Sequence, residues 1–243
     1  MSSDSSSLSL IKSYWRVSKS PFYSLIFILP LLLAYELMIF TVNRSDILGL
    51  RNGADILVRQ FFSLFHVYGF YFVGFIVLIA FGLSYYFHTR KEQNIRFSGK
   101  FFILMILESA LYALLMLFIV TLSERYLISA ITTNEGYLNI ILALGAGVYE
   151  EFIFRVILVS GFLFFLRDVL KMNSVISIFI SIAAASLLFS VFHYIGSYGE
   201  TFEFKSFAIR FGAGVFLSIL YAFRGYGITA YTHTLYDLFV ILL

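Results

Sequence analysis

The sequence predicts an all-α membrane protein, a polytopic bundle of about seven transmembrane helices. Of its 243 residues, 60% are hydrophobic and 20% are aromatic, whereas 13% are charged. Soluble domains carry about 25% charged residues, so this chain cannot cover a water-facing surface in the ordinary way. The same composition excludes intrinsic disorder, which requires low hydrophobicity and high charge. The sequence contains no Cys, which excludes a disulfide framework, a thiolate zinc site and a cysteine nucleophile.

Long apolar runs define the spans, because a helix needs roughly 20 residues to cross a bilayer. We expect spans at 22–42, 61–87, 101–122, 138–166, 175–194, 207–223 and 226–243. The 61–87 run is too long for one crossing, so the stretch 52–66 is predicted to lie on the membrane as an amphipathic helix. The loops leave no room for a separate soluble domain. Residues 1–243 are therefore predicted to form a single integral membrane domain.

Basic residues beside the spans predict the orientation. With a cytoplasmic N-terminus, the inside segments hold about twice as many Lys and Arg residues as the outside segments. The predicted inside residues are Lys12, Arg16, Lys19, Arg90, Lys91, Arg96, Lys100, Arg167, Lys171 and Arg224. We therefore expect a multi-pass protein of the cell membrane with membrane lipid as a partner. No run of basic residues points to nucleic acid.

Two adjacent carboxylates stand near the middle of the predicted 138–166 span. A charged side chain at mid-bilayer costs about 2.5–3.5 kcal/mol on insertion scales, so each one needs a reason. Arg155 follows Glu151 by four residues, on the same helix face, where the two can pair. Glu150 is rotated by about 100° and is free to face a cavity as a base or a metal ligand. The alternative, that both acids neutralise Arg155, leaves net charge in lipid. Gly145 and Gly147 would let another helix or a substrate backbone approach closely.

Two of the four His residues stand out, His193 and His233, because His66 and His88 lie near span edges or in a polar connection, where interfacial packing is expected. His193 lies toward the end of the fifth span, and His233 lies in the last span, four residues before Asp237 and on the same face. Either His alone could be a packed residue held by one hydrogen bond. Three spans that each bring ionisable groups into the membrane, with no basic residue left to pair Glu150 or Asp237, favour a site instead. A Glu, two His and an Asp can activate water directly or hold a metal ion that does so.

Three motifs, in this order on three spans, resemble the CPBP family, which comprises the CAAX prenyl proteases of the second type and the bacteriocin-processing or Abi proteins. The motifs are Glu150-Glu151-x-x-x-Arg155, Phe189-x-x-x-His193 and His233-x-x-x-Asp237, and the resemblance extends to Phe211-Gly212-Ala213-Gly214 and Tyr221-x-x-Arg224-x-x-Gly227. The resemblance covers roughly 144–240. It implies an intramembrane endopeptidase with a protease core at about 138–243 and an active-site cavity within the bundle. The same resemblance implies that Glu151 and Arg155 hold the site together.

The resemblance also implies roles for the other polar residues. Glu150 and His193 would orient and deprotonate a water molecule, and His233 with Asp237 would stabilise the tetrahedral oxyanion. The prenyl-protease branch has Asn where this chain has Asp237. An ionised Asp cannot donate a hydrogen bond to an oxyanion, so Asp237 must either be protonated or orient His233 by accepting its ring N–H, and we expect the orienting role.

Two functions from different classes stay open at this point. The first is hydrolysis of a peptide bond in a membrane-associated, lipid-modified or exported protein, by a glutamate-type or a metal-dependent mechanism. A divalent metal, zinc among the candidates, would take Glu150, His193 and His233 as ligands. The second is a non-hydrolytic carrier or an immunity-type scaffold that uses the same residues as a proton relay. A carrier would usually show internal repeats or paired broken helices, and the sequence shows neither.

Helix counting places a condition on the predicted site. At 1.5 Å per residue, Glu150 lies about 25 Å from Arg167, whereas His233 lies about 13 Å from Arg224. Upright helices that both begin at the inside surface would therefore keep Glu150 and His233 apart. The site requires that helices tilt or that an inside connection sinks into the bundle.

Overall fold

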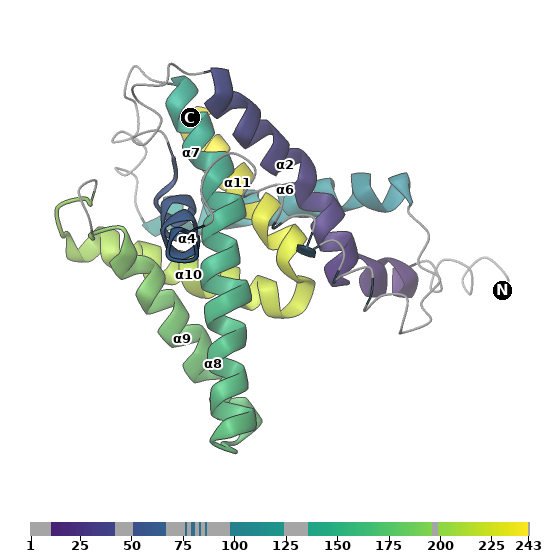
Figure 1. The fold of residues 1–243 in the computed structure, drawn as a ribbon, viewed down its shortest axis with the longest axis vertical. Helices are drawn as coiled ribbons and strands as arrows, with labels where there is room; N and C mark the ends of the chain where they lie inside the picture. The colour runs from purple at the N-terminus through teal and green to yellow at the C-terminus, as the bar shows by residue number, and fades with distance from the viewer. Residues whose placement is uncertain are drawn as a thin grey trace, which may run out of the picture.

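The computed structural model describes residues 11–41, 51–66, 76, 79, 80, 83, 86, 98–123, 136–195 and 199–242. All secondary structure in these residues is helical, as predicted. The separate helices are α2 (Pro21–Thr41), α4 (Gly53–Ser63), α6 (Gly99–Ser123), α9 (Ser174–Phe192), α10 (Phe204–Arg224) and α11 (Tyr226–Leu242). A further long helix runs between 136 and 169 (Figure 1). Most of the predicted 61–87 span lies outside the described residues.

Four of the described helices are long and apolar enough to cross a membrane. They are Pro21–Thr41, Gly99–Leu122, Ser174–Phe192 and Phe204–Arg224. Their outer faces carry large exposed apolar side chains, such as Leu111, Phe118 and Leu122 on α6 and Phe179 on α9. A helix face of this kind suits contact with lipid rather than water. The predicted all-α class is confirmed and four described helices fit a membrane protein, whereas the predicted number of seven spans is not confirmed.

The long helix that carries the two carboxylates is not a regular α-helix. It consists of α7 (Gly136–Gly145), a π-helical segment η3 (Ala146–Glu150), a second one η4 (Phe152–Val159), α8 (Ser160–Phe164) and η5 (Phe165–Val169). The residues at the junctions keep right-handed helical dihedrals, so the backbone continues without a break. π-Helical turns are rare and occur frequently at functional sites. Here two of them flank Glu151.

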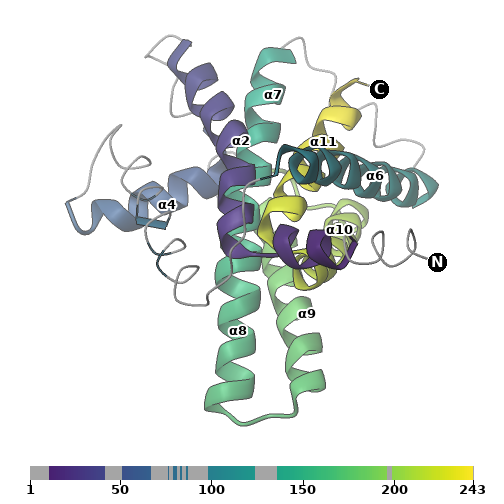
Figure 2. The same ribbon diagram turned by 90° about the vertical axis from the view of Figure 1, so that its right-hand side faces the viewer.

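Helix α11 is the central element of the bundle and packs against α2, α6, α7, η3 and α10. Helix α9 lies beside α8 and packs on α10, while α4 and α6 run crosswise to the long helix (Figure 2). The close contact of η3 with α11 depends on Gly147, because a Cβ at this position would lie 2.6 Å from the carbonyl oxygen of Ala230. The predicted close approach of another helix at this glycine is therefore confirmed.

The turn between α10 and α11 lies deep in the bundle, as the predicted meeting of Glu150 and His233 requires. Gly225 forms this turn with a φ of 78°, a left-handed conformation that favours glycine. The Tyr226 hydroxyl donates a hydrogen bond of 2.7 Å to the carbonyl oxygen of Val148, so α11 begins beside η3 rather than at the end of the long helix. Arg224, predicted to lie in an inside segment, is instead fully buried, and its Nε donates to Glu108 at 2.5 Å. The connection sinks into the bundle because Glu108 neutralises this guanidinium.

The described residues also line an apolar cavity of about 450 Å³ on one side of η4. Phe152 and Val156 of η4, Tyr221 of α10, Tyr226 of α11 and Lys19 contribute to its wall. None of the predicted catalytic residues lines this cavity. It therefore lies next to the helix that carries Glu150 and Glu151, but not at their carboxylates.

Candidate active site

Glu151 lies at the centre of a polar cluster that also contains Glu150, Arg155, His193 and His233. Its Oε1 lies 2.9 Å from Nη1 of Arg155, one turn further along the helix, and 2.6 Å from Nδ1 of His233 on α11. The side chains of Glu151 and Arg155 have no solvent-exposed surface. The predicted pairing of Glu151 with Arg155 is confirmed. The same carboxylate also fixes the ring of His233, an interaction that the sequence did not indicate because the two residues lie 82 positions apart.

Phe189 joins the third helix to this cluster. The Arg155 guanidinium lies over the Phe189 ring, 4.5 Å from its centroid, a cation–π arrangement that is stronger when desolvated. The Phe189 ring also contacts both imidazoles edge-on, with centroids 5.0 Å from His193 and 6.1 Å from His233. One aromatic side chain thus packs against residues from all three motifs. The Arg155 Nη2 reaches the carbonyl of Gly214 on α10 at 3.5 Å, which closes the cluster on that side.

His193 stands at the C-terminal end of α9, and a backbone contact fixes its tautomer. Its Nδ1 lies 2.9 Å from the carbonyl oxygen of Phe189. A carbonyl oxygen only accepts hydrogen bonds, so Nδ1 carries the proton. In the neutral imidazole the lone pair is then on Nε2.

Glu150 ends the first π-helical segment and is buried, with 6% of its surface exposed. It interacts electrostatically with His193, His233 and Arg155, so the structure brings it into the same cluster as the two His residues. Its Oε1 accepts a hydrogen bond of 2.8 Å from Nδ2 of Asn52. Asn52 is a site residue that sequence reasoning missed.

Asp237 follows His233 by one turn of α11, as predicted, but does not take the expected hydrogen bond. Its Oδ2 lies 3.6 Å from Nε2 of His233, which is too long for a hydrogen bond and within the range of an ion pair. The ring N–H that orients His233 is accepted by Glu151 instead. The physical reason is depth, because Glu151 is fully buried beside the ring, whereas the Asp237 side chain retains 28% exposure.

A divalent metal ion is the alternative occupant that the sequence left open for this cluster. Among the residues that the structure describes, no three His, Asp or Glu side chains converge as ligands for one ion. Oε1 of Glu151 and Nδ1 of His233 bind each other, and Nδ1 of His193 is bound to backbone. The described residues therefore do not form a three-ligand site in this arrangement.

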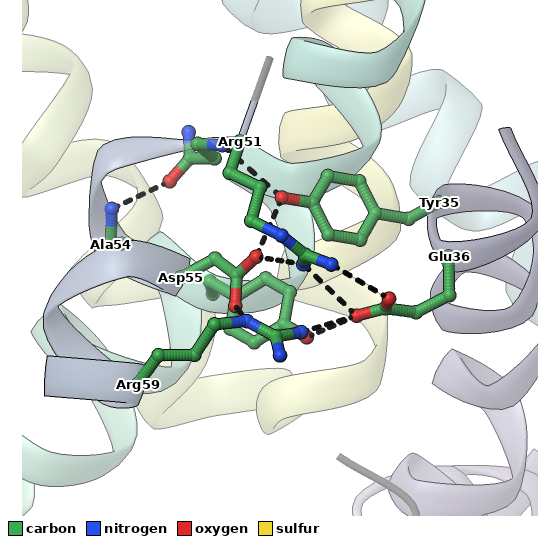
Figure 3. Close-up of polar contacts among 8 residues, drawn as sticks. Tyr35, Glu36, Arg51, Ala54, Asp55 and Arg59 are labelled. Atoms are coloured by element: carbon green, nitrogen blue, oxygen red, sulfur yellow. Dashed lines mark hydrogen bonds and ion pairs between the residues drawn. The ribbon is translucent and has the colours of Figure 1, made fainter. Parts of the chain in front are cut away.

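A second charged cluster, formed by Glu36, Arg51, Asp55 and Arg59, adjoins the site (Figure 3). Ion pairs connect these side chains. Asp55 pairs with Arg51 at 2.6 Å and with Arg59 at 2.7 Å. Arg59 also pairs with Glu36 at 2.8 Å, which joins α4 to α2. Burial alone would lower the pKa of Arg51, but the carboxylates of Asp55 and Glu36 outweigh burial and hold its pKa above the usual range. The four side chains therefore form one network between the two helices.

Comparison with known proteins points to a family. Residues 132–239 match the family model described as Type II CAAX prenyl endopeptidase Rce1-like. This match supports membership in the CPBP family for that part of the chain. The matched segment contains all three motifs, and it includes the long helix from its start, α9, α10 and most of α11. No curated protein and no solved structure matches the chain.

The family match supports an intramembrane endopeptidase of the CAAX type in general. The apolar helices fit the same class of protein. Asn52 and the second charged cluster lie before residue 132, outside the segment that matches the CPBP model. The structure therefore adds an N-terminal contribution to the site that the family match does not contain.

Proposed function

We propose that this protein hydrolyses a peptide bond in a membrane-associated protein substrate, with water activated by Glu150 and His193. The observation that carries the proposal is the tautomer of His193. Its Nδ1–H is held by the Phe189 carbonyl, so the neutral ring presents a lone pair at Nε2. The negative charge of Glu150 lies within electrostatic range of this ring. An imidazole base next to a carboxylate is a combination that removes a proton from water near neutral pH.

In the proposed first step, water donates one hydrogen bond to Nε2 of His193 and another to the free oxygen of Glu150. The water oxygen attacks the carbonyl carbon of the scissile bond, and its proton moves to this pair of bases. A tetrahedral oxyanion results. When the intermediate collapses, the C–N bond breaks and the same proton passes to the leaving amine nitrogen, which restores both bases.

In the same proposal, His233 stabilises the oxyanion. Glu151 accepts the Nδ1–H of His233, and a carboxylate at this position favours the doubly protonated, cationic ring. The Nε2–H of that cation is not taken up by a hydrogen bond to Asp237, which lies 3.6 Å away. It is therefore available to donate to the oxyanion of the substrate, and donors directed at developing charge make a large contribution to catalysis.

The substrate is inferred to be a lipid-modified protein or peptide. The matched family model describes CAAX prenyl endopeptidases, whose name specifies a prenylated substrate. The apolar cavity of about 450 Å³ beside η4 supports this inference, since Phe152 in its wall directly follows Glu151 in the chain. A hydrocarbon chain seated there would bring the attached peptide close to the catalytic helix.

The proposal is tested with the purified protein in lipid nanodiscs and a fluorogenic prenylated peptide. Glu150→Gln keeps the shape of the side chain but removes the base, and we expect kcat to fall by about 100-fold or more. The matched control is Glu203→Gln, because Glu203 is exposed at the start of α10 and should leave kcat unchanged. Full hydrolysis by Glu150→Gln contradicts the proposal. Solute transport that survives in this variant would favour the carrier instead.

A further inference from the structure

We propose that Asn52 is a positioning residue that holds the Glu150 carboxylate in its catalytic orientation. This inference rests on the proposed function. Asn52 lies directly before α4 and is buried, with 6% of its surface exposed. It is separated from Glu150 by 98 residues, yet its Nδ2 lies 2.8 Å from the Glu150 Oε1. A buried amide in this position is a candidate for more than packing, because it contacts the group that is proposed to activate water.

The capping of α4 fixes which end of the Asn52 amide faces Glu150. The Oδ1 of Asn52 accepts the backbone N–H of Ala54 at 2.8 Å and so caps the N-terminus of α4. The NH₂ group must then point toward Glu150, where it can only donate. One carboxylate oxygen of Glu150 is therefore occupied as an acceptor. The other oxygen remains for water, and the plane of the carboxylate is defined by the Asn52 contact.

A chain of hydrogen bonds holds Asn52 itself in place, and Figure 3 labels its members Tyr35, Asp55, Arg51 and Arg59. The backbone N–H of Asn52 donates to the hydroxyl of Tyr35 at 3.1 Å, and this hydroxyl donates to Oδ2 of Asp55 at 2.9 Å. Asp55 is fixed in turn by Arg51 and Arg59, at 2.6 and 2.7 Å. Tyr35 and Asp55 are fully buried. Residues whose own positions are locked in this way hold a site more accurately than residues on a free loop.

The same network returns to the helix that carries Glu150. The hydroxyl of Tyr149, the residue before Glu150, donates to Oε1 of Glu36 at 3.2 Å, and Glu36 pairs with Arg59. Gly145 allows this arrangement, because a Cβ there would lie 2.7 Å from Cβ of Asn52. Two independent contacts therefore connect the second charged cluster to η3, one through Asn52 and one through Tyr149. The small residue at 145 is needed for the first of them.

Substitutions at Asn52 separate a positioning role from a purely structural role in capping α4. Asn52→Asp retains an oxygen for the cap, since Asp is as good an N-cap as Asn, but it replaces the donor with a like charge against Glu150. Asn52→Ser also retains a capping oxygen and removes the donor. Asn173→Asp is the matched control, because Asn173 caps α9 in the same manner, through Val175 N–H at 2.9 Å, at an exposed position.

The hydrolysis assay and a thermal melt are run on all three variants. We expect Asn52→Asp and Asn52→Ser to lower kcat by about 10- to 100-fold, the equivalent of one hydrogen bond to a charged group. We expect KM to stay within about threefold, because the buried Asn52 is proposed to act through Glu150 rather than on the substrate. Asn173→Asp should leave kcat unchanged. Asn173→Asp and Asn52→Ser, which bury no new charge, should melt near the wild-type temperature, whereas Asn52→Asp should melt lower because it places a second carboxylate beside buried Glu150. Wild-type kcat in Asn52→Asp overturns the inference.

An infrared measurement distinguishes failure of this inference from failure of the proposed function. The difference spectrum of wild type minus Glu150→Gln isolates the carboxylate stretch of Glu150. We expect this band to shift in Asn52→Ser, because the hydrogen bond to Oε1 is lost, and to stay in place in Asn173→Asp. An unshifted band overturns the Asn52 contact whatever the kinetics show. A shifted band together with full hydrolysis by Glu150→Gln refutes the proposed function and leaves the contact intact.

Discussion

Replacing Arg155 with Met tests whether the buried Glu151–Arg155 pair holds the site together. Met is close to Arg in length and fills the same apolar surroundings, but it leaves the Glu151 carboxylate with His233 as its remaining cationic partner at 2.6 Å. Removing one partner of a fully buried ion pair costs about 3–5 kcal/mol. The lost contact with the Phe189 ring, 4.5 Å from the guanidinium, adds to this cost. Because His233 can take over part of the compensation, we expect a loss near the lower end of that range, about 3 kcal/mol.

The measurement is the free energy of unfolding in mixed micelles, from titration with a denaturing detergent. The matched control is Arg167→Met, because Arg167 pairs with the adjacent Asp168 at 2.8 Å with 47% of its side chain exposed. An exposed pair of this kind contributes little to stability, because water and salt screen it. The double variant Glu151→Gln with Arg155→Met should recover at least about 1 kcal/mol, since it removes the uncompensated charge. Equal losses for Arg155→Met and Arg167→Met would refute the reasoning.

Two further predictions concern packing and metal dependence. Gly147→Ala should destabilise the protein by about 1–3 kcal/mol, because its Cβ would overlap the backbone of α11 at Ala230, whereas Gly212→Ala, with no atom within 4 Å of the added Cβ, should not. A thermal or detergent unfolding series compares the two, and equal stability would contradict the close helix contact. Hydrolysis by purified protein should persist after dialysis against a strong chelator, and elemental analysis of the active sample checks the result. Loss of activity that zinc restores would instead make Glu150 and His193 metal ligands.

The sequence was most informative where polar residues interrupt apolar runs. In a membrane span a charge is costly, so the spacing of Glu151 and Arg155 predicted a pair that the structure contains at 2.9 Å. The same argument singled out His193 and His233, which the structure brings into contact with one aromatic ring, that of Phe189. Local spacing within one helix was sufficient for the pair. The meeting of the three helices was expected from the family resemblance and from the cost of unpaired charge.

Other features were not readable from the sequence because they depend on long-range geometry. The π-helical hydrogen bonds around Glu151 change the register within a run that looks like an ordinary apolar helix. No local sequence spacing connects Asn52 with Glu150. The sequence around Asn52 indicates only a helix N-cap in a polar connection. In the sequence, Arg224 resembles a residue that flanks a span at the membrane surface, because it ends an apolar run. In the structure it is buried and pairs with Glu108 on another helix. Each of these features is decided by a partner more than 90 residues away or by the backbone itself.

The two His residues of the site differ in the acceptor that holds Nδ1, and this difference supports different roles for them. In His193 the acceptor is a neutral backbone carbonyl, which is compatible with a neutral ring that has a lone pair on Nε2. In His233 the acceptor is the buried Glu151 carboxylate, which balances a positive charge on the ring. Identical side chains are thereby suited to opposite tasks, one to accept a proton from water and one to donate to an oxyanion. Arg155 completes this division, because it pairs with the Glu151 carboxylate at 2.9 Å and holds it in place beside His233.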